Sequence, residues 1–179
     1  MRVLLIALLA AVLPGCTMLD RAPVHIAQPV HGVEEVNNIY RDGRFFFSGQ
    51  PDQNAIAELA DRGVIKVINI RGEQEMAERV AFDEEAVCTD LHMTYVHLPL
   101  PREGRDEWLD QFEHELRVSR GPVLIHCGSS NRVGAVWGRY LRVKRGYTAE
   151  DALLRAQAAG VRSDSLIEWV TAPVPSVSH

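Results

Sequence analysis

Strand-like and helix-like segments alternate along most of this chain, and this alternation limits the folds that it can adopt. The run "VIKVINI" at 64–70 is rich in β-branched residues and almost continuously apolar, which is typical of a strand buried on both faces. Strand-like runs also occur at 45–47, 93–100 and 122–127, and a helical pattern follows each of the four. The sequence therefore predicts a three-layer α/β fold, in which a mostly parallel sheet of four to five strands carries helices on both faces.

The expected helices place apolar side chains at the spacing of one helix face. Between 105 and 119, for example, Trp108, Phe112 and Leu116 share a face. We expect helices within 52–63, 73–88, 105–119, 132–144, 148–160 and 163–170. In sheets of this type the active site lies beyond the carboxyl ends of the strands, which gathers the segments 71–73, 101–104 and 127–132 at one edge.

Length and charge exclude several classes of function. The chain has 179 residues, enough for one domain, with 46% apolar and 24% charged residues, the balance of a globular protein. Its net charge of −5 offers no basic surface for nucleic acid and would not attract it to an anionic membrane.

The first sixteen residues, "MRVLLIALLAAVLPGC", read as a targeting segment. Arg2 precedes an apolar run at 3–13 that is too short to span a bilayer as a permanent helix. Gly15 followed by Cys16 resembles the lipobox of bacterial lipoproteins, in which the cysteine becomes the lipidated N-terminus. The alternative is a plain secretory signal with an incidental cysteine.

The lipobox resemblance sets the expected domain organisation and location. It implies a signal peptide over 1–15, with a lipidated N-terminus and tether over 16–36, where prolines occur without periodicity. A folded domain is expected over 37–171 and a flexible tail over 172–179. Thr17 after the cysteine implies a lipid-anchored protein of the bacterial cell envelope that faces the periplasm, at the outer membrane.

The stretch "LIHCGSSNRVG" at 124–134 carries the main candidate chemistry. Cys127 follows a predicted strand and Arg132 opens a predicted helix. The N–H groups of such a loop and the positive end of the helix dipole form a cradle for an oxyanion and stabilise a thiolate. Arg132 can hold two oxyanion oxygens at once, as lysine cannot.

Each residue of the loop receives an expected role. Cys127 is the nucleophile and Arg132 the transition-state clamp. His126 orients the loop. The expected phosphate-binding residues are Gly128, Ser129, Ser130, Asn131 and Arg132. The alternative is that Cys127 is a small core residue and Arg132 a solvated arginine in the first turn of a helix.

The pair His126-Cys127 with a downstream arginine resembles the protein tyrosine and dual-specificity phosphatases. The upstream text "FFFSGQPDQNAIAELADRGVIKVINIRGEQE", followed by "YVHLPL", resembles one branch of them, the beta-lactamase-hydrolase-like phosphatase domain, which also has Cys-x4-Arg. The resemblance covers about residues 36–160. It implies a dual-specificity phosphatase-like fold, a phosphocysteine intermediate on Cys127, and a phosphorylated protein or small molecule as substrate, with phosphotyrosine among the candidates. It implies no cofactor and no metal.

The chain departs from the phosphatase pattern at three places. Val133 stands where a Ser or Thr is usual, and Ser130 stands in place of a mid-loop glycine. The aspartate that usually acts as general acid after the third strand is absent. Glu103, in "PREG", is the first choice for that role. Asp106 is the second choice, although it is expected to cap the helix that carries Trp108.

Two further functions compete with phosphoester hydrolysis. Rhodanese-type sulfurtransferases also use a Cys-x4-Arg loop, which is sized for a persulfide on the cysteine. A catalytically inactive phosphate-binding module would keep the loop without turnover. Cys88 is expected to be a buried apolar residue, with a regulatory disulfide to Cys127 as the alternative.

Overall fold

A central sheet of six strands organises the computed structural model, which describes residues 26–33, 36 and 38–174. The strands are β1 (Gln28–Pro29), β2 (Tyr40–Asp42), β3 (Phe45–Ser48), β4 (Lys66–Asn69), β5 (Thr94–His97) and β6 (Val123–His126). They lie in the order β1-β2-β3-β6-β4-β5. The first three strands form antiparallel pairs, whereas β3, β6, β4 and β5 run parallel.

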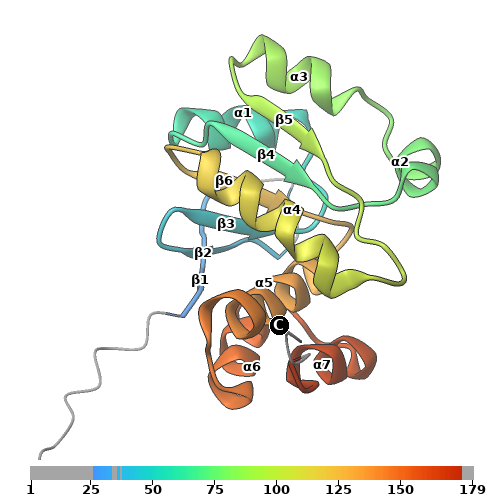
Figure 1. The fold of residues 1–179 in the computed structure, drawn as a ribbon. Helices are drawn as coiled ribbons and strands as arrows, with labels where there is room; N and C mark the ends of the chain where they lie inside the picture. The colour runs from blue at the N-terminus through green and yellow to red at the C-terminus, as the bar shows by residue number, and fades with distance from the viewer. Residues whose placement is uncertain (1–25, 34–35, 37, 175–179) are drawn as a thin grey trace, which may run out of the picture.

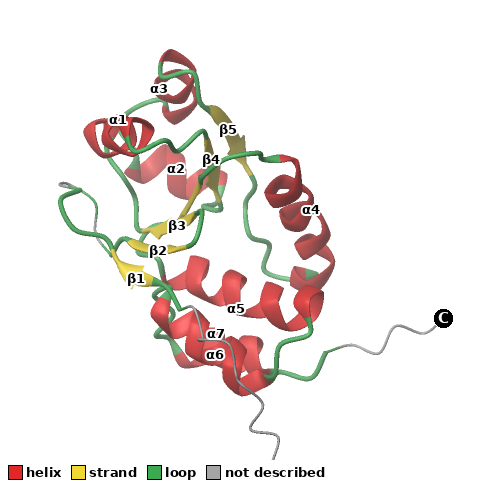
Figure 2. Ribbon diagram, turned by 90° about the vertical axis from the view of Figure 1, so that its left-hand side faces the viewer, coloured by secondary structure: helices red, strands yellow, loops and turns green. Residues whose placement is uncertain are grey.

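Helices cover both faces of this sheet (Figure 1). They are α1 (Gln53–Asp61), α2 (Glu73–Arg79), α3 (Glu84–Asp90), α4 (Arg105–Val118), α5 (Asn131–Arg145), α6 (Ala149–Ala158) and α7 (Asp164–Thr171). α1 and α3 pack on one face, and α4 and α5 on the other; α6 and α7 lie outside α5, as Figure 2 shows. No helix within the described residues is long and apolar enough to cross a bilayer.

The alternation of side chains along the central strands builds two separate cores. In β3, Phe46 packs with α1 and α3, while its neighbour Phe47 packs with α5. In β6, Leu124 and Ile125 divide in the same way. All four are buried, because β6 has β3 and β4 on its two sides and helices on both faces.

The α/β fold class expected from the sequence is confirmed, but the sheet has six strands instead of four to five. The two additional strands are the short antiparallel β1 and β2 at one edge, and their length left little pattern to detect. β1 lies within the range 16–36 that was expected to be a tether. Ala27, next to it, is buried in the core on the α5 side. The signal peptide and Cys16 lie outside the described residues.

The single helix expected over 73–88 is two helices. α2 ends where Val80 adopts an extended conformation, and α3 begins after Asp83, whose carboxylate accepts a hydrogen bond from the N–H of Ala86 at 3.0 Å. α2 contributes no buried residue. It therefore lies at the periphery, whereas α3 buries Glu84 and Cys88.

Helix α5 approaches α6 closely because glycines form part of their interface. A Cβ atom on Gly134 would lie 2.4 Å from the N atom of Val161 and 2.6 Å from the carbonyl oxygen of Ala156. On Gly138 it would lie 2.6 Å from the Cβ of Ala156. These backbone atoms cannot move away independently, so the packing of the two helices depends on the missing side chains.

We expect Gly134→Ala to destabilise the fold. In an unobstructed helix this change would stabilise the fold by up to about 1 kcal/mol. Here the added methyl group meets backbone atoms at the end of α6 and in the turn after it, those of Ala156, Gly160 and Val161. A cost of about 1–3 kcal/mol in the free energy of unfolding is typical of such overpacking. Urea unfolding would measure it, and a variant as stable as the wild type would contradict the close packing.

Candidate functional site

The cysteine loop lies at the carboxyl end of the sheet, between two other strand ends. The N–H of Cys127 donates to the carbonyl of Ser48, the last residue of β3, at 3.2 Å. On the other side, the N–H of Ile70 donates to the carbonyl of His126 at 3.0 Å. The loop is therefore held on both flanks by its neighbours in the sheet, at the edge where the sequence placed it.

Cys127 and Arg132 lie together in this loop. Cys127 is completely buried, while the side chain of Arg132 is about one-third exposed. Burial acts to lower the pKa of Arg132, but the hydrogen bonds and charges of Glu75 and Cys127 outweigh it and raise the pKa. The guanidinium thus stays positively charged beside the thiol, as an oxyanion clamp requires.

The loop turns at Ser130, where φ is +65°. This is the left-handed region in which glycine is comfortable, and it is the position where the phosphatase pattern has a glycine. The Ser130 hydroxyl donates to the carbonyl of Ala159 at 2.9 Å, which offsets part of the strain. Gly128 serves another purpose, because a Cβ there would lie 3.1 Å from a carboxylate oxygen of Glu75 and 3.5 Å from Arg132 Nη2.

Ser129 and Asn131 connect the loop to the turn between α6 and α7. The carbonyl of Ser129 accepts a hydrogen bond from Arg162 at 3.0 Å. The side-chain oxygen of Asn131 accepts from the N–H groups of Arg162 and Ser163 at 2.8 and 3.2 Å. In this state both residues fix the shape of the loop through these contacts.

Glu75, on α2, is a site residue that the sequence reasoning did not identify. Its Oε1 atom lies 2.7 Å from Arg132 Nη2 and 3.0 Å from Arg71 Nε. Partial burial acts to raise the pKa of the Glu75 carboxyl, but the hydrogen bonds and charges of Arg132 and Arg71 outweigh it, so the pKa lies below its usual value. The carboxylate is therefore ionised at neutral pH and lies against the cysteine loop.

A second carboxylate, Glu84, is buried beneath the loop. Asn69 Nδ2 and the hydroxyl of Tyr95 donate to its Oε2 atom at 2.8 and 3.0 Å, and Gln50 donates to its Oε1 atom. His126 Nε2 lies 3.3 Å from Oε2. Burial acts to raise the pKa of Glu84, but the contact and charge of His126 and the bonds from Gln50 and Tyr95 outweigh it and lower the pKa.

Glu84 is also the charged neighbour of His126. The imidazole is fully buried directly before Cys127, and its Nε2 atom faces the Glu84 carboxylate, whose hydrogen-bond donors come from the neighbouring strands. Gln50, which binds Glu84, also accepts a hydrogen bond from Arg71. A continuous polar network therefore joins Glu84 to Arg71, and Arg71 contacts Glu75 at the loop.

The two candidates for the general acid occupy different environments. Asp106 accepts bonds from Arg139 at 2.9 and 2.5 Å and from the indole N–H of Trp169 at 3.1 Å. The bond to Arg139 comes first among the causes that hold the pKa of Asp106 below its usual value, against a smaller opposing effect of burial. Such a carboxylate stays ionised and is a poor proton donor. Glu103 is exposed in the short loop before α4.

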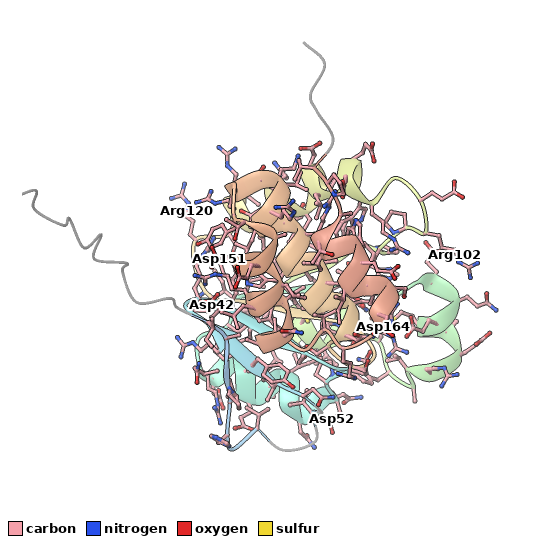
Figure 3. All side chains as sticks on the ribbon, turned by 90° about the horizontal axis from the view of Figure 1, so that it is seen from below. Asp42, Asp52, Arg102, Arg120, Asp151 and Asp164 are labelled. Atoms are coloured by element: carbon pink, nitrogen blue, oxygen red, sulfur yellow. The ribbon has the colours of Figure 1, made fainter. Side chains whose placement is uncertain are left out.

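Two cavities adjoin at this end of the molecule. One, of about 610 Å³, is lined by Arg132, by the α2 residues Glu73, Gln74, Glu75 and Glu78, and by Leu100, Pro101, Arg102 and Arg105 on the opposite side, with Gly72 and Leu166. Glu103 lines the other cavity, which shares Arg102 and Arg105 with the first. Figure 3 shows Arg102 at the edge of the molecule beside α2. The structure thus places Glu103 next to the Arg132 cavity and not inside it.

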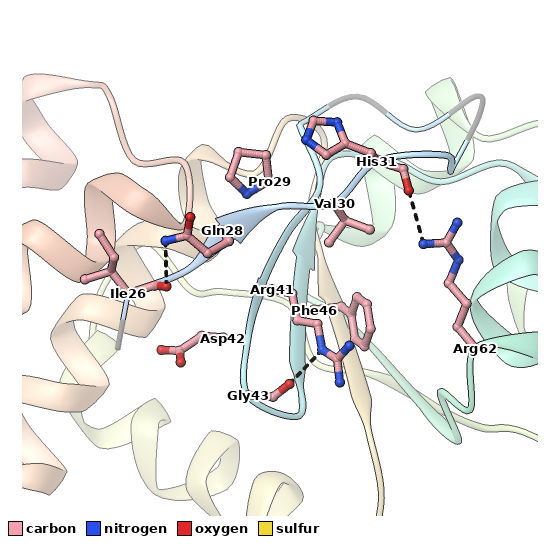
Figure 4. A pocket seen from close by; sticks show the side chains of 10 residues that line it. All are labelled: Ile26, Gln28, Pro29, Val30, His31, Arg41, Asp42, Gly43, Phe46 and Arg62. Atoms are coloured by element: carbon pink, nitrogen blue, oxygen red, sulfur yellow. Dashed lines mark hydrogen bonds between the residues drawn. The ribbon is translucent and has the colours of Figure 1, made fainter. Parts of the chain in front are cut away.

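A larger cavity than the one beside Arg132 lies elsewhere. It has about 850 Å³ and is lined by residues of β1, β2 and their surroundings, among them His31, Arg41 and Arg62 (Figure 4). Both arginines are engaged by carbonyl groups there, Arg41 by Gly43 and Arg62 by His31 and Gly32. None of the cysteine-loop residues lines this cavity, so size alone does not mark the reactive site.

Cys88 and Cys127 are both free thiols. Cys88 packs in the core with α1, and Cys127 in the core with α5, on the opposite face of the sheet. Burial, with a smaller contribution from the charges of Glu84 and Glu85, raises the pKa of Cys88 to about 12. Cys88 is therefore an inert core residue in this state. Among the described residues, no group of three or more His, Cys, Asp or Glu side chains could hold a metal ion.

Comparisons with known proteins point in one direction. The model of the family described as "Beta-lactamase hydrolase-like protein, phosphatase-like domain" matches residues 42–140, more than half of the chain. A beta-lactamase hydrolase-like protein of Xylella fastidiosa is 29% identical over 91 residues, which make up 50% of this chain and 21% of that protein. The chain thus spans only about a fifth of the length of the curated relatives that it matches.

Solved structures share the fold at low sequence identity. TpbA of P. aeruginosa superposes with a TM-score of 0.63 and 23% identity, over 84% of this chain and 88% of that one. A putative phosphatase (nma1982) of Neisseria meningitidis gives a TM-score of 0.62 and 23% identity, over 72% of this chain and 92% of that one. These likenesses agree with the dual-specificity phosphatase-like architecture expected from the sequence.

We expect Glu84→Gln to destabilise the protein by about 1–3 kcal/mol at pH 7, because buried donors lose a charged acceptor. Since folding lowers the pKa of Glu84, its stabilisation is fully present above the ordinary value of 4.5 and is lost as the pH falls through the lower folded value. The difference in the free energy of unfolding between variant and wild type should therefore become smaller from pH 7 to pH 3, as measured by urea unfolding.

The exposed neighbour Glu85 provides the control for this experiment. Glu85→Gln removes the same charge from the same helix without touching the buried network, so its stability should stay within about 0.5 kcal/mol of the wild type. If Glu84→Gln behaves like Glu85→Gln, the network does not stabilise the fold.

Proposed function

Because the chain belongs to the family of the phosphatase-like domain of beta-lactamase hydrolase-like proteins, we propose that it is a cysteine-dependent hydrolase of phosphomonoesters. One observation carries the proposal: Cys127 and Arg132 share a loop at the carboxyl end of the parallel sheet, and Arg132 lines a cavity large enough for a small phosphoester or a phosphorylated side chain. The loop offers a nucleophile and a positive charge at one place.

The reaction would proceed in two displacements at phosphorus. The Cys127 thiolate attacks the phosphoryl group, and the bond between phosphorus and the ester oxygen breaks as the P–S bond forms. The leaving oxygen takes up a proton. Water then attacks the phosphocysteine, which releases inorganic phosphate and restores the thiolate. Arg132 and the loop N–H groups stabilise the phosphoryl oxygens in both steps.

The proton of the first step is proposed to come from Glu103. Its loop lies between β5, which ends at His97, and α4. The loop adjoins the Arg132 cavity and has a left-handed glycine, Gly104, at the start of α4. Such a loop can carry a proton donor toward a bound substrate. Asp106 is the weaker candidate, because its ion pair with Arg139 keeps the carboxylate ionised.

A phosphorylated protein or small molecule is the proposed substrate. TpbA, whose fold this chain shares, has been solved in complex with phosphotyrosine. Likeness at this level of identity supports the fold alone, so phosphotyrosine is one candidate within the broader class of phosphomonoesters. The net charge of −5 argues against nucleic acid as a partner.

A second reaction is favoured by the size of the loop. Four residues separate Cys127 from Arg132, and a loop of this length also suits a persulfide. In that reaction Cys127 would accept a sulfane sulfur from thiosulfate, releasing sulfite, and pass it to a nucleophile such as cyanide. A phosphate-binding module without turnover is the remaining alternative.

The protein is further proposed to be a lipid-anchored member of the bacterial cell envelope. The support is the N-terminal sequence, in which an apolar run ends in Gly15 and Cys16. Cys16 would carry the lipid, and residues after it would tether the domain at the periplasmic face of the outer membrane.

Activity assays with two substrates separate these functions. Phosphatase action predicts turnover of an aryl phosphate that falls by on the order of a thousandfold or more in Cys127→Ser, since serine is a far weaker nucleophile here. Arg132→Lys should lose roughly a hundredfold, because an ammonium cannot bind two oxygens side by side. Thiocyanate production from thiosulfate and cyanide would instead identify sulfur transfer.

Binding distinguishes the third alternative from the other two. If neither substrate is turned over but inorganic phosphate raises the melting temperature of the wild type, the loop binds anions without catalysis. An Arg132→Lys variant with near-normal rates would refute the proposed clamp.

The anchor has an independent test. Cys16→Ala removes the proposed lipidation site, so the protein should leave the membrane fraction and appear in the soluble fraction of cells that express the full chain. Membrane fractionation with an antibody against the folded domain measures the change. An unchanged distribution would refute anchoring through this cysteine.

A further inference from the structure

Glu75 lies at the point where the proposed phosphate would bind. Its Oε1 atom is 2.7 Å from Arg132 Nη2 and 3.0 Å from Arg71 Nε, so two guanidinium groups converge on one carboxylate oxygen. The same atom lies 3.1 Å from the position that a Cβ on Gly128 would take, directly against the cysteine loop. The residue comes from α2, far from the loop in sequence.

The Glu75 carboxylate and a phosphoryl group would bind the same arginine side chain, Arg132. Both are anions that bind arginine through oxygen atoms at 2.7–2.9 Å. Arg132 is the proposed clamp for the substrate, and in this structure its Nη2 atom is engaged by Glu75. Cys127 is completely buried in the same state. A dianionic phosphoryl group placed beside the Glu75 carboxylate would meet like-charge repulsion.

From these contacts we propose that Glu75 is an intramolecular competitor of the substrate, whose carboxylate must leave Arg132 before a phosphoryl group can bind there. The inference rests on the proposed function, since it takes Arg132 as the phosphate clamp. It assigns Glu75 a role in setting the affinity for phosphoesters, apart from the chemical step.

The surroundings of α2 allow such a displacement. The helix has seven residues and buries none of them, and the side chain of Glu75 is about 29% exposed. Arg71, by contrast, is held by Gln50 and by its own burial, so one of the two arginines stays in place when the carboxylate moves. The movement therefore requires a side-chain rotation or a small shift of α2 and leaves the core intact.

The alternative role for Glu75 predicts the opposite result. A carboxylate that merely orients Arg132 would support catalysis, and its loss would slow the reaction and weaken binding. A competitor instead lowers the affinity for anions, and its loss would strengthen binding. The direction of the change in affinity thus separates the two roles.

The test is Glu75→Gln in the full-length protein, with orthovanadate as the probe of the anion site and an aryl phosphate as substrate. Gln keeps the shape and one acceptor for Arg71 but removes the negative charge. We expect the inhibition constant of vanadate and the KM for the aryl phosphate to fall about three- to tenfold, with kcat unchanged within about twofold. Glu75→Ala should shift both constants in the same direction.

Glu78→Gln is the matched control. Glu78 lies on the same helix and lines the same cavity, but its carboxylate accepts from Gln74 at 2.8 Å and contacts neither arginine in the interactions described above. Removing its charge tests whether the loss of any negative charge near the cavity is enough to strengthen the binding of vanadate and the aryl phosphate. We expect changes of less than twofold in this control.

Four results would overturn the proposal. A higher KM or a kcat lowered more than tenfold in Glu75→Gln would assign Glu75 to orienting Arg132. Equal gains in affinity in Glu75→Gln and Glu78→Gln would show that the loss of any negative charge near the cavity strengthens anion binding, without a specific role for Glu75. If Glu75→Gln has the same kcat, KM and vanadate inhibition constant as the wild type, Glu75 does not compete with the substrate, and the proposed function still stands. If neither wild type nor Glu75→Gln binds vanadate or phosphate, the anion site itself is refuted, and both proposals fall together.

Discussion

The site depends on the hydrogen bonds that converge on the buried carboxylate of Glu84. This carboxylate joins the ends of four parallel strands, because its partners come from the segment after β3, from β4, from β5 and from β6. A buried charge of this kind is tolerated only when donors surround it, and here the donors are the residues next to the anion loop. The backbone of His126 is held by the strands on either side, and its imidazole faces this carboxylate at the start of the cysteine loop.

The main features of the fold could be read from the sequence because they depend on local patterns. The almost continuous apolarity of 64–70 and the helix face formed by Trp108, Phe112 and Leu116 are local patterns, and β4 and α4 lie where these patterns predicted a strand and a helix. The short β1 was missed because a two-residue strand has no period to detect. The break between α2 and α3 was missed because "VAFD" continues an amphipathic pattern until Asp83 caps the second helix.

For the site, the sequence placed Cys127 and Arg132 in one loop beyond a strand, and the structure has them there. It did not identify Glu75 or Glu84, since both stand in a polar segment where glutamates are usually solvated. Their importance comes from contacts across 57 residues in one case and 15 in the other. The proton donor stays a prediction: Glu103 adjoins the Arg132 cavity, and its approach to a bound substrate depends on loop movement.

Helix α2 differs from every other helix of the described chain in burying no side chain. It contacts the cysteine loop through the ion pair of Glu75 with Arg132, which a phosphoryl group would replace under the proposal above. Under the proposal above, the free energy of anion binding at the loop includes the free energy of breaking this ion pair, so ligand affinity and the position of Glu75 on α2 are thermodynamically linked. Substrate binding would loosen the rim of the cavity while it fills the base, the reverse of the closing lid found in many enzymes.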